Sequence, residues 1–160
     1  MWEGAVVSVH LARETGAPTF AVSQVMAVAG AGLEGDRNFR PGGGQDHKRQ
    51  ITLIERETLE ELAGDPGIRL DPGEHRRNVV TSGVALNDLV GVEFQVGAVR
   101  LLGVELCEPC KYLENLTGRP GLLRALVHHG GLAARILDDG VIRVGDPVTG
   151  VRRNATAGRS

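Results

Sequence analysis

Aromatic residues are scarce in this chain, with three Phe, one Tyr and one Trp among 160 positions. The hydrophobic core must therefore be built from Val, Leu, Ile and Ala side chains. An excess of one charge is also missing, since 18 Lys and Arg face 20 Asp and Glu. This near balance argues against binding of nucleic acid or of a membrane surface through bulk electrostatics.

Long apolar runs are absent as well. No stretch approaches the roughly 18 residues that a membrane-spanning helix needs. The N-terminus shows no basic region followed by an apolar run, so no signal peptide is visible. We therefore expect a cytoplasmic protein. In that reducing compartment the two cysteines indicate metal or redox chemistry more often than a structural disulfide.

Glycine, in contrast, is abundant, with 23 residues. This number indicates many turns and bulges, which suits a loop-rich β fold better than a helix bundle. The length is that of one ordinary domain, which buries enough surface to fold without disulfides. We expect one domain over residues 1–149, followed by a small, polar and basic tail over residues 150–160 that is disordered.

Apolar runs rich in β-forming residues predict about eight strands. In the second run we expect Phe20, Val22 and Val25 to point inward. The fifth and sixth runs form the clearest hairpin, and the last two predict another, because Asp138-Asp139-Gly140 joins them and Asp-Gly is a strong hairpin signal. The runs lie at residues 5–11, 19–28, 50–54, 78–81, 92–97, 99–106, 133–137 and 141–144.

Two or three short helices accompany these strands. They are expected at residues 56–63 and 108–115 and from Pro120 to just before Gly130, with one further helical turn at residues 86–90. The chain shows neither an alternation of strands and helices nor an internal repeat. The predicted fold class is therefore mainly β, a closed or nearly closed barrel with helices covering its ends.

The sharpest local feature is a Cys-Glu-Pro-Cys-Lys motif at residues 107–111, where an apolar strand gives way to an expected helix. Partly unpaired N–H groups at a helix start favour a thiolate. Thiols at such a position commonly have a pKa below the free value of about 8.5; we expect Lys111 to act in the same direction and Glu108 to oppose it. Cys107 and Cys110 are thus suited to nucleophilic, sulfur-transfer or soft-metal chemistry.

Three other interpretations compete for the two thiols. Both can be small buried hydrophobic residues. They can form half of a zinc site, but His128 and His129 are adjacent and lack the usual ligand spacing. Pro109 is typical of a thioredoxin-like redox pair, yet that motif normally lies early in a strand-helix-strand unit and not two-thirds along a β-rich chain.

Three polar segments, at residues 32–37, 42–49 and 75–78, add further candidates. Each has two interpretations. Residues 32–37 can form a bend that presents Asp36 and Arg37, or only a bend with a local ion pair. Residues 42–49 can bind a phosphate through backbone N–H groups and cations, or form a solvated loop. Residues 75–78 can form an anion site, or only place surface charge at the start of a strand. The side chains that these segments would offer are Asp36, Arg37, Lys48, Arg49, Arg77 and Asn78.

Taken in order, five groups of residues resemble the MOSC family, named for the C-terminal domain of molybdenum-cofactor sulfurase. The resemblance spans roughly residues 4–149 and implies a β-barrel of the pyruvate-kinase-barrel type. Its order and spacing make a chance match implausible, although no single group is decisive. The groups lie at residues 32–37, 49–54, 77–81 with 86–91, 107–113 and 142–148.

The resemblance also implies a central cysteine that carries sulfur or coordinates the molybdenum of the molybdopterin cofactor. By position this residue is Cys110. Cys107 is then an extra thiol, and we hypothesise that it resolves a persulfide or disulfide formed at Cys110. The pterin carries a terminal phosphate, so the site should offer cations and amides, with Asp36 and Arg37 positioning this shell or shaping the loop. The residues carried over for the phosphate are Lys48, Arg49, Arg77, Asn78 and Lys111.

Two departures from the family narrow the expected function. The sulfurases carry an additional pyridoxal-phosphate domain, for which 160 residues leave no room, and the amidoxime-reducing members carry an N-terminal barrel domain. No flavin or iron–sulfur motif is visible. Sulfur or electrons must therefore come from a separate partner protein. We expect either persulfide transfer or reduction of small N-hydroxylated substrates, and the alternative is a metal-free thiol redox or partner-binding module on the same barrel.

Overall fold

The structure, a computed structural model, describes residues 3–42, 47–64, 75–107 and 130–150, together with positions 67 and 70. These residues form eleven strands, one α-helix, α1 (Arg56–Gly64), and one 3-10 helix, η1 (Leu86–Leu89). The strands are β1 (Glu3–Leu11), β2 (Phe20–Val22), β3 (Gln24–Val28), β4 (Gly32–Leu33), β5 (Ile51–Glu55), β6 (Val79–Ser82), β7 (Glu93–Val96), β8 (Val99–Leu106), β9 (Leu132–Ile136), β10 (Gly140–Arg143) and β11 (Pro147–Gly150).

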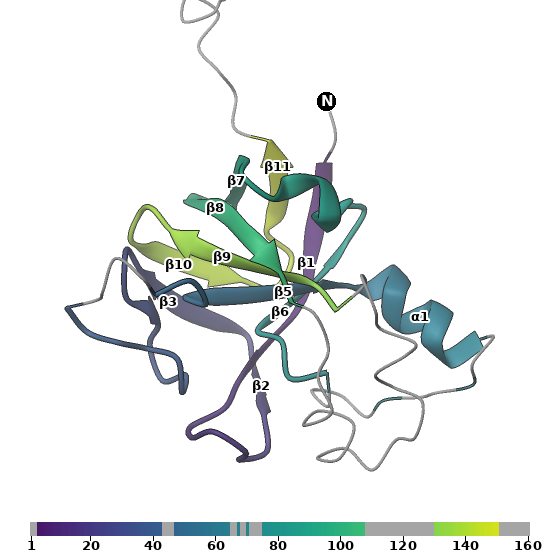
Figure 1. Ribbon diagram of the computed structural model, residues 1–160, viewed down its shortest axis with the longest axis horizontal. Helices are drawn as coiled ribbons and strands as arrows, with labels where there is room; N and C mark the ends of the chain where they lie inside the picture. Colours follow the sequence, from purple (N-terminus) through teal and green to yellow (C-terminus); the bar gives the residue numbers. More distant parts are fainter. Residues whose placement is uncertain are drawn as a thin grey trace, which may run out of the picture.

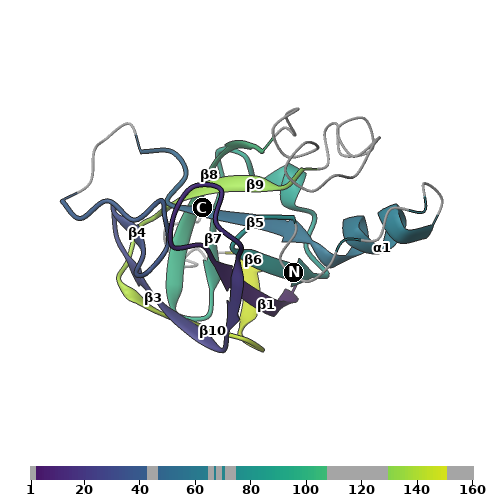
Figure 2. The ribbon, with the colours of Figure 1, turned by 90° about the horizontal axis from the view of Figure 1, so that it is seen from below.

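Seven strands close a barrel in the order β1, β11, β7, β8, β9, β5, β6 and back to β1 (Figure 1). Closure leaves no unpaired edge in this ring of strands. All neighbours in the ring are antiparallel except β5 and β6. Because parallel neighbours need a crossover connection, the chain leaves the barrel wall after β5. Figure 2 shows α1 projecting from the wall at this point. The mainly β, closed-barrel fold class is thus confirmed.

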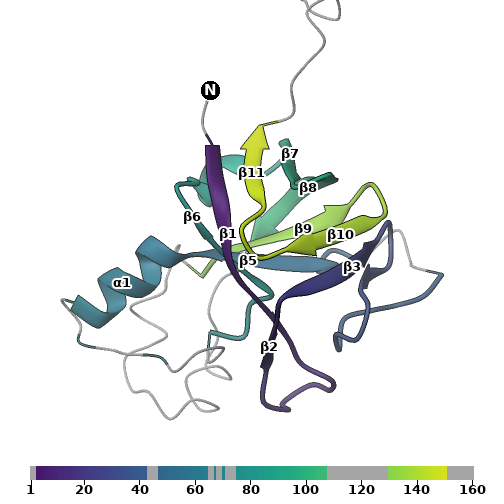
Figure 3. The same cartoon turned by 180° about the vertical axis from the view of Figure 1, so that it is seen from behind.

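One long strand links the barrel to a second, smaller sheet. The first residues of β1 pair with β11, and its last residues pair with β2 along the same edge, while β6 occupies the opposite edge. Figure 3 shows β11 beside the upper part of β1 and β2 beside its lower part. The chain then continues from β2 into β3, which pairs with β4 and β10 in a three-stranded sheet.

The strand predicted over residues 19–28 is divided into two at Ser23. Val25 is buried as expected and Val22 is half-buried. The expectation for Phe20 is wrong, since its side chain is exposed. Phe20 pairs with Leu11, the last residue of β1, and its ring lies 5.4 Å from the Arg13 guanidinium. The Phe20 ring therefore lies at the surface beside a cation, whereas its strand partner Leu11 belongs to the core.

The hairpin predicted over residues 133–144 is also wrong. β9 pairs with β5 and β8 in the barrel, whereas β10 pairs with β3 in the small sheet. Asp138 binds Arg100 at 2.9 Å, and Asp139 accepts a hydrogen bond from the backbone N of Ala29 at 2.7 Å. These partners lie far away in the sequence. The Asp-Asp-Gly connection therefore turns a corner between two sheets.

Most other local predictions are confirmed. The helix predicted at residues 56–63 is α1, the helical turn at 86–90 is η1, and the hairpin at 92–106 is β7 with β8. β4 and β11 were not predicted, and β11 includes Gly150, the first residue of the expected tail. The helices expected at 108–115 and from Pro120, and the rest of the tail, lie outside the described residues. No helix in the described part of the chain is long and apolar enough to span a membrane.

The barrel interior is aliphatic, as the composition predicts. β8 shows the expected period of two, with Val99, Leu101 and Gly103 facing inward. Each large apolar side chain buried in this way contributes about 1.5–3 kcal/mol relative to its exposed state. Among the largest fully buried side chains one is aromatic. The set comprises Phe94, Leu33, Ile51, Leu53, Ile54, Leu86, Leu101, Leu132, Ile136 and Ile142.

Candidate functional site

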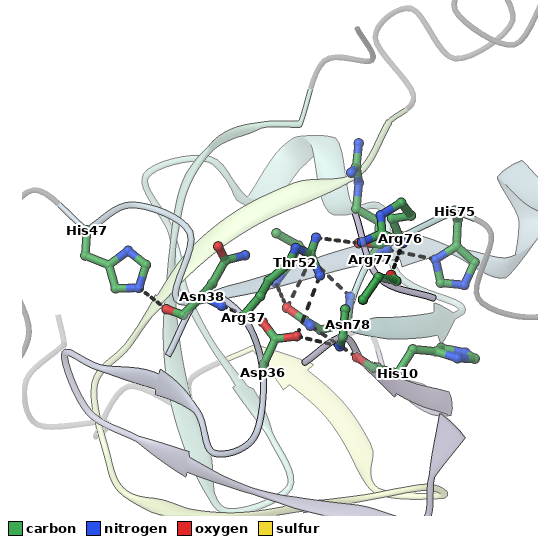
Figure 4. Close-up of polar contacts among 12 residues, drawn as sticks. His10, Asp36, Arg37, Asn38, His47, Thr52, His75, Arg76, Arg77 and Asn78 are labelled. Atoms are coloured by element: carbon green, nitrogen blue, oxygen red, sulfur yellow. Dashed lines mark hydrogen bonds and ion pairs between the residues drawn. The ribbon is translucent and has the colours of Figure 1, made fainter. Parts of the chain in front are cut away.

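Asn78 ties three neighbouring strands of the barrel together (Figure 4). It precedes β6, and its side-chain Oδ1 accepts hydrogen bonds from the backbone N of Thr52 in β5 at 3.0 Å and from the Thr52 hydroxyl at 3.1 Å. Its Nδ2 donates to the carbonyl of His10 in β1 at 3.1 Å. Donors face the amide oxygen and an acceptor faces the amide nitrogen, which fixes the orientation of the amide. The amide is thus engaged within the fold, and the expected contact of Asn78 with a cofactor stays a prediction.

Arg77 places a buried guanidinium at the point where the chain returns to the barrel. Its Nε donates to the carbonyl of Gly130 at 2.7 Å. The neighbouring Cys107 is the last described residue after β8, and its backbone N donates to the carbonyl of Gly131 at 2.7 Å. Cys107 and Gly130 are therefore the two described residues that flank segment 108–129, and Arg77 bonds to Gly130.

Cys107 itself has a side chain that is 0% exposed. Its carbonyl packs so closely against Gly130 that a Cβ at position 130 would clash with it, and a Cβ at Gly131 would likewise clash with the carbonyl of Leu53. The two glycines thus let β9 enter the narrow space between β5 and β8. Burial of the Cys107 sulfur restricts its contact with any reagent, and the resolving role suggested for this thiol stays a prediction.

Asp36 and Arg37 lie next to the same region, in the bend after β4. The Asp36 carboxylate accepts hydrogen bonds from the backbone N of Ala12 at 3.0 Å and of Asn38 at 3.2 Å. Its Oδ1 also lies 3.7 Å from Arg37 Nη1. The Nη2 of Arg37 donates to the carbonyl of Arg76 at 3.3 Å. Asp36 therefore holds the bend, and the bend directs Arg37 toward residues 76–77.

Two buried histidines, His10 and His75, complete this region. Their rings are 4.9 Å apart in an edge-to-face arrangement, and the hydroxyl of Ser8 lies 2.8 Å from His10 Nε2. Burial lowers the pKa of His10 below its usual value of 6.5. Burial, followed by the charges of His10 and Arg77, lowers the pKa of His75 to about 3. His75 is thus neutral at pH 7, and its Nδ1 accepts a hydrogen bond from the backbone N of Arg77 at 2.9 Å.

Lys48 and Arg49 are exposed, on the segment that leads into β5. The preceding His47 is buried, and its Nε2 lies 2.6 Å from the carbonyl of Asn38, to which it donates. Figure 4 shows His47 on the far side of Asn38 from Arg77. The structure therefore gathers Arg37, Arg77 and Asn78, whereas Lys48 and Arg49 are exposed between His47 and β5, and their expected contact with a phosphate stays a prediction.

Cys110 and Lys111, the remaining predicted site residues, lie outside the described residues. So do His128 and His129. Within the residues that the structure does describe, no group of three or more His, Cys, Asp and Glu side chains could hold a metal ion. The described side of the site therefore consists of Arg37, Arg77 and two buried histidines, of which His75 is neutral at pH 7.

Sequence reasoning missed the roles of His10, His75 and Thr52. His75 lies in segment 75–78, but its hydrogen bond with Arg77 depends on the backbone turn between them, which the sequence does not indicate. Thr52 bonds to Asn78, 26 residues away, and His10 packs against His75, so no local pattern indicates these contacts. Gly130 and Gly131 were interpreted as a helix stop. Two consecutive glycines before a strand can also indicate close backbone approach, which is the role they have here.

The sequence model of the MOSC domain matches residues 19–149. The chain belongs to the MOSC domain family. This family is associated in general with binding of the molybdenum cofactor. The match includes β2 to β10, most of β11 and all the described candidate site residues except His10 and Ser8.

Solved structures share the fold of this MOSC domain. The YuaD protein from Bacillus subtilis is 21% identical with a TM-score of 0.78, covering 92% of this chain and 97% of that chain. YiiM from Geobacillus stearothermophilus is 20% identical with a TM-score of 0.72, covering 96% of this chain and 78% of that one. YiiM from Escherichia coli is 18% identical with a TM-score of 0.66, covering 94% and 71% respectively. No curated protein matches the sequence.

Proposed function

We propose that this MOSC domain binds the molybdenum cofactor and acts through Cys110. In one version Cys110 carries a persulfide and passes its sulfur on. In the other, the cofactor-loaded domain reduces small N-hydroxylated substrates. The observation that carries the proposal is the buried guanidinium of Arg77, which bonds to Gly130, and Gly130 packs against Cys107; these two residues flank the segment containing Cys110.

Covalent geometry supports a common site for these groups. Cys110 follows Cys107 by three residues, and three residues of extended chain span at most about 11 Å. We therefore propose that Cys110 acts close to the end of β8. Arg77 contacts the residue at the other end of the same segment, Gly130.

The described residues fit the anionic end of a molybdopterin. Arg77 is buried and Arg37 nearly so, and guanidinium groups bind phosphate through paired N–H donors. Their burial strengthens the attraction to an anion, because the local dielectric constant is lower than in water. His75 is neutral at pH 7 and does not compete for the phosphate as a cation.

The roles of the individual residues follow from this placement. Cys110 would hold the metal, since a thiolate is a soft ligand suited to molybdenum, and Cys107 would act as the second thiol. Bound molybdenum would supply the exchange of oxygen or sulfur with the substrate. Asp36 would hold the bend that directs Arg37. The residues proposed to contact the phosphate are Arg37, Lys48, Arg49, Arg77, Asn78 and Lys111.

A separate protein is part of the proposal. Both versions consume something that the described residues do not provide, either sulfur in the persulfide state or two electrons. We propose a sulfur donor or an electron-transfer protein as the partner, with the small molecule as the substrate and with no role for nucleic acid or membrane.

The test is the molybdenum and pterin content of protein purified from a host that makes the cofactor. Wild type, Cys110→Ser and Arg77→Gln are compared with Cys107→Ala as the matched thiol control. We expect near-stoichiometric metal and pterin in wild type and Cys107→Ala, loss of metal in Cys110→Ser, and reduced pterin in Arg77→Gln. If all four proteins fold and none contains either component, the cofactor reading is rejected, and the metal-free thiol module becomes the better description.

A further inference from the structure

Arg76 has a backbone conformation that residues with a side chain rarely adopt. Its φ is 62°, and it is the one residue other than glycine with a positive φ in the described part of the chain. In this left-handed region the Cβ comes too close to the following carbonyl oxygen. The few residues that tolerate it are mostly Gly, Asn and Asp. An arginine at this position therefore indicates that surrounding contacts hold the conformation.

Two long-range contacts hold Arg76. Its Nη1 donates to the carbonyl of Ala17, in the loop between β1 and β2, at 2.6 Å. Its own carbonyl accepts the hydrogen bond from Arg37 at 3.3 Å. The residue is 8% exposed, and both contacts are part-buried. Together they fix the side chain of Arg76 and the peptide plane that leads to Arg77.

The turn at Arg76 determines the direction of Arg77. It folds the chain back so that the backbone N of Arg77 reaches the Nδ1 of His75, two residues earlier, at 2.9 Å. In an extended segment, neighbouring residues would instead point to opposite sides. With this reversal, the Arg77 guanidinium reaches the carbonyl of Gly130.

We propose that Arg76 is a positioning residue: anchored to Ala17, it holds the left-handed turn that places the Arg77 guanidinium against Gly130. The effect of this turn on ligand binding rests on the proposed function, in which Arg77 contacts a phosphate. The effect on the direction of Arg77 does not, and it is measurable without any ligand.

The experiment compares two substitutions that remove the same anchor. Arg76→Ala loses the contact with Ala17 and keeps a Cβ that disfavours positive φ. Arg76→Gly loses the same contact, but glycine adopts positive φ freely. The first readout is the chemical shift of the Arg77 Nε–H group in nitrogen-15 spectra, identified by its absence in Arg77→Lys. Overall destabilisation does not move this shift in the folded population.

The second readout is the dissociation constant for inorganic phosphate, from titration of the same samples. We expect Arg76→Gly to keep the Arg77 resonance and to bind phosphate within about threefold of wild type. Arg76→Ala should move the resonance toward that of solvated arginines and weaken phosphate binding about tenfold, the loss expected for one charge-assisted hydrogen bond. If Arg76→Ala does not fold, Arg76→Asn replaces it, and both Asn and Gly should then keep the resonance.

The alternatives give different results. Loss of the resonance in Arg76→Gly, or its retention in Arg76→Ala, would overturn the positioning role. A resonance that follows the prediction in a protein that binds no phosphate would leave Arg76 as the positioning residue and remove the phosphate contact from the proposed function.

Discussion

Replacing Asn78 with Ala tests whether the side-chain amide serves to join the strands of the barrel or to contact a ligand. The substitution removes the acceptor of the Thr52 N–H and the side-chain donor to the His10 carbonyl. Both backbone groups belong to buried residues, and Asn78 is 2% exposed, so water cannot easily replace the lost partners. A ligand-binding arm, in contrast, could be shortened at little cost to the protein without its ligand.

The expected loss of stability follows from these contacts. A buried backbone group left without its partner costs about 1–3 kcal/mol. Two such groups give about 2–6 kcal/mol, and the small cavity left by the amide adds to this. We expect a decrease in the free energy of unfolding of about 3–5 kcal/mol. A domain of this kind is stable by about 5–15 kcal/mol in total, so the change is a large fraction.

The measurement is equilibrium unfolding in urea followed by far-ultraviolet circular dichroism. With a slope of about 2 kcal/mol per molar, the midpoint of Asn78→Ala should fall by about 2 M. Thr52→Val is the matched control, because it removes the hydroxyl that donates to the same amide oxygen. This hydroxyl also accepts from the backbone N of Asn78, which keeps the carbonyl of Thr52 as an acceptor. Thr52→Val should cost about 1 kcal/mol. If Asn78→Ala lowers the free energy of unfolding by less than about 1 kcal/mol, the amide does not stabilise the strand contacts, and a ligand-binding role is favoured.

Three further predictions concern other residues of the site. His75 has a pKa of about 3 in the folded protein, below its unfolded value of 6.5. As the pH falls, the unfolded chain is therefore protonated before the folded protein. The contribution of neutral His75 to stability is complete above pH 6.5 and is lost as the pH falls toward 3. Between pH 7.5 and 5.5 the free energy of unfolding should fall by about 1.4 kcal/mol, and His75→Asn, which keeps an acceptor, should flatten this dependence when unfolding is measured across that range. Gly131→Ala should lower the free energy of unfolding in urea by more than about 3 kcal/mol, because φ at this position is 106° and the new Cβ would clash with a carbonyl of β5. Gly145→Ala is the control: φ there is 93° but nothing lies within 4 Å, so the loss should be about 1–2 kcal/mol. Equal losses would contradict the argument that Gly131 is needed for close approach of the backbones. In a Cys110→Ser background, iodoacetamide should label Cys107 at least about 100-fold more slowly in the native protein than in urea. The sulfur is buried, so the reagent reaches it only through local opening of the fold. Rapid labelling of the native protein would instead show that Cys107 is available as a second thiol.

The strands that the sequence predicts well are those whose environment repeats along the chain. β8 alternates buried and less buried residues over its first six positions, and this period of two is visible without knowledge of its neighbours. β11 has no such signal, since it contains Pro147, Thr149 and Gly150 in four residues. It exists because β1 and β7 pair with its two edges, which is information outside the segment.

The error at Asp138 and Asp139 has the same physical cause. An Asp-Gly pair indicates a tight turn when the aspartate bonds to its own backbone. Here the Asp138 carboxylate bonds to Arg100, and the Asp139 carboxylate bonds to the backbone of Ala29. With their carboxylates committed to distant partners, the residues form a corner between two sheets.

The candidate site shows why neighbouring residues of one motif can have different roles. Arg76, Arg77 and Asn78 are consecutive and polar, and their sequence predicts an anion site without distinguishing among them. Their partners are the carbonyls of Ala17, Gly130 and His10, which lie 53 to 68 residues away in the sequence. Backbone carbonyls carry no residue-specific signal, so no sequence pattern announces these contacts.

The fold therefore gives consecutive residues of the 76–78 segment different structural roles. Asn78 can bond to β5 and β1 only if the chain enters β6 in register, and Arg77 can reach Gly130 only if the chain has reversed just before it. Arg76, with its positive φ, provides this reversal. The neutral ring of His75 then accepts a hydrogen bond from the backbone N–H of Arg77. A positive charge on His75 would remove that acceptor and repel Arg77. The low pKa of His75 and the direction of Arg77 therefore depend on the same burial, so acidification that charges His75 should also release the guanidinium from Gly130.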